Sequence, residues 1–189
     1  MNRQIKPDEV TRLIESQQIE LKKSLSLQKE ACEALCGMLN ADAAKGLVLF
    51  GVAPDGSIVG VEPGDLDKAQ KSLAQHVRDN FDPPLAVSIE IFECGDRHLV
   101  VMQAQRPKTI VLYEYDGRAF IREGSSRRRL TVAEKAGLGS RRLRDTHQGP
   151  WRCDGCGSIA GMISGIVGTD KGIEKSYECG CGGEYWPAT

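Results

Sequence analysis

Residues 85–105, LAVSIEIFECGDRHLVVMQAQ, contain two runs of branched apolar residues that flank the segment CGDR. Valine and isoleucine favour extended backbone, whereas glycine and aspartate favour a tight reversal of the chain. The stretch therefore predicts a β-hairpin formed by residues 85–92 and 98–105. Similar runs recur around similar turns elsewhere in the chain, so the hairpin sets the expectation for the whole fold.

Two further hairpins are predicted around Asp-Gly pairs, which two-residue turns prefer. The flanking runs are GLVLFGV (46–52) with SIVGV (57–61), and TIVLYEY (109–115) with RAFIRE (118–123). A chain with three hairpins favours a sheet in which antiparallel pairs dominate.

The stretch ESQQIELKK (15–23) alternates polar and apolar residues from its fourth position onward. A period of two is typical of a half-buried strand, with Ile19 and Leu21 pointing inward and Glu20 and Lys22 sharing the opposite face. That face has two interpretations at this point: it is the solvated edge of a small fold, or it is a functional site.

Four helices are predicted from apolar residues spaced three and four apart. They cover residues 7–16, 32–39, 66–77 and 130–138. Cys32 and Cys36 lie on the apolar stripe of the second helix and are expected in the core rather than at a metal. Thr131 and Glu134 have the spacing of a capping box at the start of the fourth. The sequence predicts an α+β fold, a largely antiparallel sheet with flanking helices.

The composition changes after residue 143. Residues 1–143 form the predicted first domain, RDTHQGP (144–150) is typical of a linker, and residues 151–189 combine glycines and cysteines with few aliphatic residues. So short a segment cannot normally bury enough apolar surface to fold without a metal or disulfides.

Four cysteines in this tail form two close pairs. They are Cys153, Cys156, Cys179 and Cys181, within CDGCG and CGCG. Four thiolates suit the tetrahedral coordination of structural Zn²⁺. We expect a small C-terminal zinc ribbon; an iron–sulfur site or a redox pair is the alternative.

Neither the composition nor the N-terminus indicates a membrane protein. The chain is 40% hydrophobic and 27% charged, and no run approaches the roughly 20 apolar residues of a membrane span. MNRQIKPDEV lacks the apolar run of a signal peptide, so we expect a cytoplasmic protein with reduced cysteines.

Positive charge is concentrated in residues 118–144, which hold nine Lys or Arg against two acidic residues although the net charge of the chain is −1. Such a cluster is typical of a surface that binds a polyanion, because each neutralised phosphate releases counterions. RRR follows a Gly-Ser pair and is expected to extend from a loop. The candidate contacts to RNA or DNA are Arg122, Arg127, Arg128, Arg129, Arg141 and Arg142; the alternative is a solvated face.

Three segments together resemble the Schlafen AlbA-type domain. They are ESQQIELKKSL (15–25), MLNADAAKGLVLFGVAPDGSIVGVEP (38–63) and RAFIREGSSRRRLTVAE (118–134), so the resemblance extends over residues 8–140. The family is described as DNA-binding and is related to the RNA-cleaving core of Schlafen proteins. One departure is NADAAKG (40–46), where the family commonly shows Asn-Thr-x-Gly-Gly.

The resemblance implies a catalytic site. Glu15 and Glu20 match the first two carboxylates of the nuclease triad, Asp55 is the candidate for the third, and Lys22 matches the lysine of an E-x-K element. The carboxylates would hold Mg²⁺ or Mn²⁺, and Lys22 would act electrostatically. The alternatives stay open. Glu20 and Lys22 are then the polar face of an edge strand, and Asp55 is a turn residue. Either Pro54 or Asp55 occupies the place equivalent to the third carboxylate.

Two functions follow from the resemblance and the basic segment. One is a metal-dependent endoribonuclease acting on structured RNA such as tRNA. The other is a non-catalytic DNA- or RNA-binding module or transcriptional regulator, so the sequence leaves open whether the protein is an enzyme. Schlafen cores pair two related lobes around a groove, so a chain with one lobe implies a homodimer.

Overall fold

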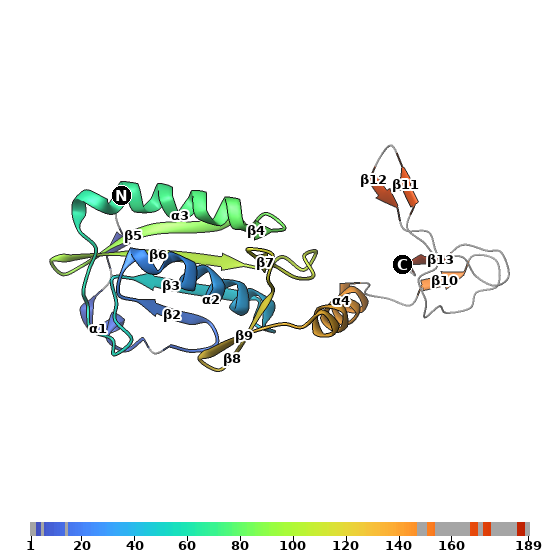
Figure 1. Cartoon of the computed structure of the whole chain (residues 1–189), viewed down its shortest axis with the longest axis horizontal. Coiled ribbons are helices and arrows are strands. Elements are labelled where there is room, and N and C mark those ends of the chain that lie inside the picture. The colour runs from blue at the N-terminus through green and yellow to red at the C-terminus, as the bar shows by residue number, and fades with distance from the viewer. Residues whose placement is uncertain are drawn as a thin grey trace. The chain divides into compact units, whose positions relative to one another are not determined.

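The computed structural model describes residues 3–4, 6–13, 15–146, 151–153, 167–169, 172–174 and 185–187. The chain divides into two compact units, Met1–Ser140 and Arg141–Thr189. Figure 1 shows the helices and strands of each.

The first unit is built on a five-stranded sheet with the strand order β1-β5-β6-β3-β2 (Figure 1). These strands are β1 (Arg3–Gln4), β5 (Val87–Cys94), β6 (Arg97–Gln105), β3 (Lys45–Phe50) and β2 (Ile19–Lys22). The central hairpin of β5 and β6 is the one predicted from residues 85–105. β6 also pairs antiparallel with β3, but β1 and β2 run parallel to their neighbours. The sheet is therefore mixed, which corrects the expectation of a largely antiparallel one.

The parallel edge at β2 arises because a helix, rather than a turn, connects β2 to β3. The connection contains η1 (Leu25–Leu27) and α2 (Gln28–Asn40). Two neighbouring strands can run parallel only if a crossover of this kind returns the chain to the same end of the sheet. The helix was predicted at residues 32–39, but its effect on strand direction was not.

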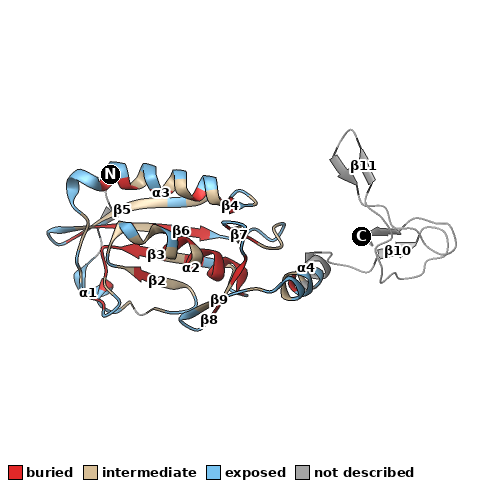
Figure 2. Ribbon diagram, in the orientation of Figure 1, coloured by how far each residue is buried: buried red, intermediate tan, exposed pale blue. Residues whose placement is uncertain are grey.

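α2 and α3 (Leu66–Asn80) pack on one face of the sheet and enclose the larger core. Leu73 of α3 and Met102 of β6 are buried there, and Figure 2 shows α3 exposed along its outer side. Cys32 and Cys36 are fully buried, which confirms that they are core residues. Burial raises the pKa of both thiols to about 12, so they stay protonated.

A short helix and a loop cover part of the opposite face. α1 spans only Pro7–Val10, shorter than the helix predicted over residues 7–16. Val10 packs with Leu21 and Leu99 in a second, smaller core. Farther along the strands, apolar side chains on this face are only half-buried.

Residues 51–61 fold back toward β3 without forming the second strand that the sequence predicts. Val52 and Ile58 make a single antiparallel bridge, and the chain turns between them. Gly51 and Gly60 have φ of +92° and +81°, a region that side chains with a Cβ rarely adopt. The two glycines bend the segment out of the sheet, so that no regular ladder forms.

The remaining elements as far as residue 146 lie beside the sheet. They are η2 (Pro63–Asp65), β4 (Phe81–Asp82), β7 (Glu114–Tyr115), β8 (Phe120–Glu123), β9 (Ser126–Arg129) and α4 (Val132–Thr146). β4 pairs with β7, and β8 pairs with β9. The predicted pairing of residues 109–115 with 118–123 is therefore wrong except for the turn itself and one bridge, Tyr115 with Arg118.

α4 begins with the predicted capping box. The Thr131 amide donates to Glu134 Oε2 at 2.8 Å, and the Glu134 amide donates to Thr131 Oγ1 at 3.3 Å. The helix continues to Thr146, into the segment expected to be a linker. The described helices include none with the length and apolar composition of a membrane span.

Two strand pairs are described in the second unit. They are β10 (Trp151–Cys153) with β13 (Tyr185–Pro187), and β11 (Val167–Thr169) with β12 (Gly172–Glu174), both antiparallel. Cys153 ends β10, but the other three predicted zinc ligands, Cys156, Cys179 and Cys181, lie outside the described residues. The zinc ribbon stays a prediction.

Candidate nucleic-acid interface

Glu20 is buried on the side of β2 that faces α2, and two cations contact its carboxylate. Lys22 Nζ binds Oε1, and Arg122 Nη1 binds Oε2. The side chains of Glu20 and Arg122 are only 6% and 1% exposed. Both carboxylate oxygens therefore have a charged donor within the protein.

The guanidinium of Arg122 also connects three stretches of backbone. Its Nε donates to Ser16 O at 2.7 Å and to Gly124 O at 3.3 Å, and its Nη2 donates to Ile19 O at 3.3 Å. The five N–H donors of a planar guanidinium allow this. Arg122 was expected to contact nucleic acid, but β8 directs it inward toward α2. It is structural, and no nucleic acid can reach it in this arrangement.

Glu15 lies at the outer edge of β2. A turn closed by the Ser16 amide and Ile19 O, 3.0 Å apart, brings Glu15 back beside the strand. Its Oε1 accepts the Leu21 N–H at 3.2 Å. β2 is an edge strand, so this outward N–H has no strand partner, and an open edge invites pairing with other chains. Glu15 thus accepts the hydrogen bond of an edge N–H that would otherwise be free to pair with a further strand.

Asp55 shapes the turn between Val52 and Ile58. Its Oδ1 accepts from Ser57 Oγ at 2.6 Å and from the Ser57 amide at 2.9 Å. These hydrogen bonds, the side-chain one first, lower the pKa of the exposed Asp55 carboxyl. This geometry is the one expected of a turn residue.

The carboxylates that the family resemblance assigns to a metal do not fit a divalent ion in this arrangement. Both oxygens of Glu20 bind cations, Glu15 accepts a backbone amide, and Asp55 is bonded to Ser57. Within the described ranges, no group of three or more His, Cys, Asp or Glu is placed to hold a metal ion. No catalytic step through a metal is derived from these residues.

Arg127 lies on the inner side of the β8–β9 hairpin, opposite Arg122 in the ladder. Its Nη2 and Nε donate to Glu33 Oε2 on α2, at 2.8 and 3.2 Å. The RRR segment was expected in a loop, but it forms β9. Strand alternation therefore divides its three arginines between two sides of the hairpin.

Arg128 lies on the outer side and is 46% exposed. It binds Glu123 Oε1 at 3.0 Å and Glu134 Oε1 at 2.8 Å. The hydrogen bonds that Arg128 donates to these acids, to Glu123 first, raise its pKa. Exposed ion pairs of this kind contribute little to stability, so Arg128 can exchange a carboxylate for a phosphate at small cost.

Arg129 is exposed and, in the part of the chain that the structure describes, no acidic side chain pairs with it. Arg141 and Arg142 follow in the second half of α4, where Arg142 is half-buried. Among the candidate arginines with described side chains, Arg129 is thus the exposed one that has no acidic partner within the described ranges.

Acidic residues, most of them from outside this segment, offset much of the positive charge seen in residues 118–144. Five of the nine basic residues have acidic partners: Arg118 with Asp116, Arg122 with Glu20, Arg127 with Glu33, Arg128 with Glu123 and Glu134, and Lys135 with Glu114. The cluster is therefore less basic in space than in sequence.

Sequence reasoning missed Asn40 as a structural centre. Its Nδ2 donates to Tyr113 O at 2.8 Å and to Phe120 O at 2.9 Å, and its Oδ1 accepts the Tyr113 N–H at 2.9 Å. Asn40 is fully buried and fastens the first residue of β8 to α2. A polar residue at the end of an apolar helical stripe was the available indication.

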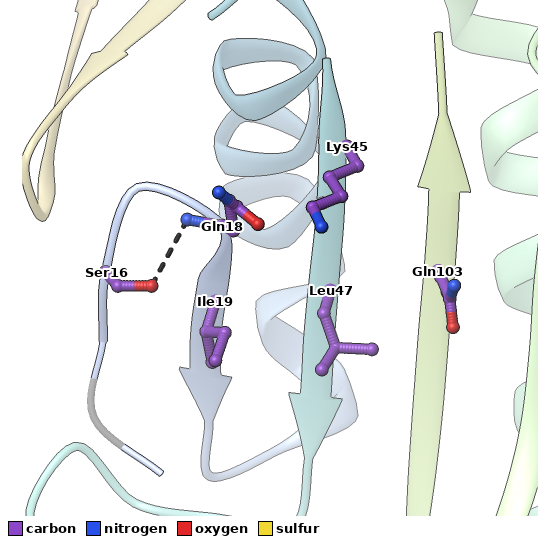
Figure 3. Close-up of a pocket in the computed structure, with 7 residues that line it drawn as sticks. Ser16, Gln18, Ile19, Lys45, Leu47 and Gln103 are labelled. Atoms are coloured by element: carbon purple, nitrogen blue, oxygen red, sulfur yellow. Dashed lines mark hydrogen bonds between the residues drawn. The ribbon is translucent and has the colours of Figure 1, made fainter. Parts of the chain in front are cut away.

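A hollow of about 420 Å³ lies beside the first residues of β2 and β3, on the sheet face away from α2. Figure 3 shows Ile19, Leu47 and Gln103 side by side on β2, β3 and β6, with Lys45 at the rim. Lys45 is the one cation among the residues that line it. The hollow therefore lacks the charge of a phosphate site, and the exposed arginines of β9 remain the better candidate surface.

Comparison with known proteins finds a matching family for most of the first unit. Residues 15–131 match the family model described as Schlafen, AlbA_2. No curated protein matches the chain.

Two solved structures are similar. The DIP2311 protein from Corynebacterium diphtheriae shares 13% sequence identity, with a TM-score of 0.47, over 81% of this chain and only 26% of that one. The N-terminal domain of a RecG-related protein from Nitrosomonas europaea shares 26% identity, with a TM-score of 0.47, over 67% of this chain and 91% of that one.

Proposed function

Because this chain belongs to the Schlafen AlbA_2 family, we propose that it is a nucleic-acid-binding protein that contacts the phosphate backbone through the exposed arginines of β9. These are Arg128, on the outer side of the β8–β9 hairpin, and Arg129, at the open end of the hairpin opposite Phe120. Arg141 and Arg142, in the second unit, are proposed as separate contacts. Arg122 and Arg127 hold the hairpin in place from its inner side.

The observation that carries this proposal is the exposed Arg129, which no acidic side chain in the described ranges neutralises. Arg128 lies beside it with weak, exposed partners. Phosphates that bind these arginines gain charge-assisted hydrogen bonds, while Arg128 gives up only pairs that water already screens.

The test is a binding titration of the full chain with a labelled stem-loop RNA and a labelled DNA duplex at several salt concentrations. We expect Arg129→Gln to weaken binding and to lower the slope of log K against log salt by about one. The matched control is Arg78→Gln on the outer side of α3, where the arginine is exposed and contacts Gln75. This control should bind as the wild type does.

Equal effects of Arg129→Gln and Arg78→Gln would show that only net charge matters, and would overturn the assignment to the hairpin. Absence of binding by the wild type to either probe would overturn the function itself. A preference for one probe would distinguish RNA from DNA as the partner.

A metal-dependent endoribonuclease is the finer proposal, and one observation favours it. The turn after Glu15 does return its carboxylate to β2, within 3.2 Å of the Leu21 amide and so beside Glu20. Cleavage of tRNA by the wild type in Mn²⁺, abolished by chelator and by Glu15→Gln, would support the nuclease. Binding without cleavage in any lane would leave the protein a binding module.

For the tail we propose structural Zn²⁺ held by Cys153, Cys156, Cys179 and Cys181. In support, β10 pairs with β13, and Cys153 lies opposite Tyr185, which follows Cys181 by four residues in the sequence. Metal analysis should find one zinc per chain, and Cys156→Ser should lose it. Iron in its place, or a metal-free chain, would contradict the proposal.

The family resemblance also leads us to propose a homodimer with two lobes around the substrate. Light scattering of the full chain measures this directly, and a monomer at working concentration would exclude it.

A further inference from the structure

We propose that Glu20 is a positioning residue: its buried ion pair with Arg122 fastens the β8–β9 hairpin to β2 and so holds Arg128 and Arg129 at the binding surface. The inference rests on the proposed nucleic-acid binding. It gives Glu20 a role different from the metal ligand that the family resemblance implies.

The β8–β9 hairpin needs an anchor because it forms a two-stranded sheet of its own, separate from the five-stranded sheet. Each of its strands has four residues. Two-stranded hairpins of this size are at best marginally stable in water. The orientation of their outer side chains therefore depends on contacts to the rest of the fold.

Three contacts supply that anchor. Asn40 binds Phe120 O at the open end, while Glu20 binds Arg122 and Glu33 binds Arg127 on the same rung of the ladder, next to the turn. The hairpin also packs directly on α2. A Cβ added to Gly37 would lie 3.3 Å from the backbone at Ile121 and Arg122.

The Glu20–Arg122 contact is the anchor that joins the hairpin turn to the sheet. Arg122 binds Gly124 O in its own turn and Ser16 O and Ile19 O next to β2. Glu20 supplies the charge that keeps this guanidinium buried, since an unpaired buried cation is strongly unfavourable. Without Glu20, Arg122 is expected to turn toward water and release the turn.

The ladder then transmits the displacement to the exposed arginines of β9. Arg128 lies opposite Ile121, and Arg129 lies opposite Phe120. If the turn separates from β2, the partly exposed Glu33–Arg127 pair is left to hold the rung next to it, and the Asn40 contact holds the open end. Arg128 and Arg129 would then no longer keep fixed positions for binding phosphates.

The test is a double-mutant cycle in binding, measured with a labelled stem-loop RNA and a labelled DNA duplex in EDTA. Glu20→Gln should weaken binding as much as Arg129→Gln does and lower the salt slope by the same amount, about one. Adding Arg129→Gln to Glu20→Gln should cause no further loss, whereas independent residues would give additive losses. Glu114→Gln, which removes the half-buried partner of Lys135, is the matched control and should bind normally.

The chelator separates positioning from metal binding, because a metal ligand cannot matter when no divalent ion is present. If Glu20→Gln binds as the wild type does in EDTA and weakens only in Mn²⁺, the inference is overturned. Fully additive losses would also overturn it. A wild type that binds neither probe would instead refute the proposed function.

A second variant covers the case in which Glu20→Gln lacks a cooperative unfolding transition. Arg122→Lys keeps the positive charge but cannot reach Ser16 O, Ile19 O and Gly124 O together. It should reproduce the loss of binding and the lack of additivity with Arg129→Gln. Hydrogen exchange should become faster in β9 and stay unchanged in α3. Wild-type exchange in β9 would count against the anchoring role.

Discussion

The inner and outer sides of the β8–β9 hairpin use the same residue type in opposite ways. On the inner side, Arg122 is 1% exposed and pairs with a buried carboxylate. On the outer side, Arg128 is 46% exposed and pairs with carboxylates that water also reaches. A charge in the interior is costly to leave unpaired, whereas an exposed one is solvated with or without its partner. Arginine is thus structural on one side and available for binding on the other.

Arg122→Ala should produce the largest effect, because it leaves Glu20 buried with only Lys22 as a partner. Breaking a buried pair costs about 3–5 kcal/mol, so we expect a loss of that size in the free energy of unfolding. Urea denaturation followed by circular dichroism measures it. A loss no larger than that of Arg128→Ala would remove the distinction between the two sides.

Asn40→Ala should follow, since it removes three hydrogen bonds to the backbone of Tyr113 and Phe120 and leaves Tyr113 O with only the Cys36 thiol as a donor. We expect a loss of about 2–3 kcal/mol in the same assay. The matched control is Asn80→Ala, which removes a single half-buried bond to His76 O. If both substitutions cost the same, Asn40 is not the anchor of the inner side.

Arg127→Ala tests an intermediate case, because the Arg127 and Glu33 side chains are 30% and 16% exposed. We expect a loss of about 0.5–1 kcal/mol, and less in high salt. A loss close to that of Arg122→Ala would mean that the stability lost with an inner contact does not depend on how deeply that contact is buried.

The outer side should show the smallest effect, in a titration rather than in stability. Hydrogen bonds from Thr131, with Arg128 contributing less, lower the pKa of Glu134. Because the pKa of Glu134 is lower in the folded chain than in the unfolded chain, ionised Glu134 stabilises the fold at pH values above its unfolded pKa. This stabilisation is lost as the pH falls through its folded pKa. Thr131→Val removes the hydroxyl donor but keeps the Thr131 amide, which is the largest cause, so it should raise the Glu134 pKa only in part, as NMR titration would show. A return of this pKa to its ordinary value in the variant would mean that the hydroxyl, rather than the amide, is the main donor.

Local patterns were sufficient for much of the fold. The β5–β6 hairpin, α2, α3 and the Thr131–Glu134 cap all follow from residues within one turn or one hairpin of each other. The same reasoning failed for the strand expected at residues 57–61 and for the pairing of residues 109–123. In both places, alternative backbone partners elsewhere in the unit competed with the adjacent segment.

The candidate site was harder to predict because its contacts join distant parts of the chain. Arg122 and Glu20 are 102 residues apart, and Arg127 and Glu33 are 94 apart. Counting charges in a window of sequence cannot include such partners. The nine basic residues therefore seemed freer to bind a polyanion than they are.

The sequence by itself determined that ESQQIELKK contains a strand and that Glu20 and Lys22 share a face of it. Only the tertiary structure decided that this face is turned inward and that the RRR segment forms a strand. α2 packs against one face of β2 and one side of the β8–β9 hairpin, so Glu20 and Arg122 meet in the interior while Arg128, on the other side, remains at the surface. The physical reason is that alternation is a property of the backbone, whereas burial depends on the element that packs against it.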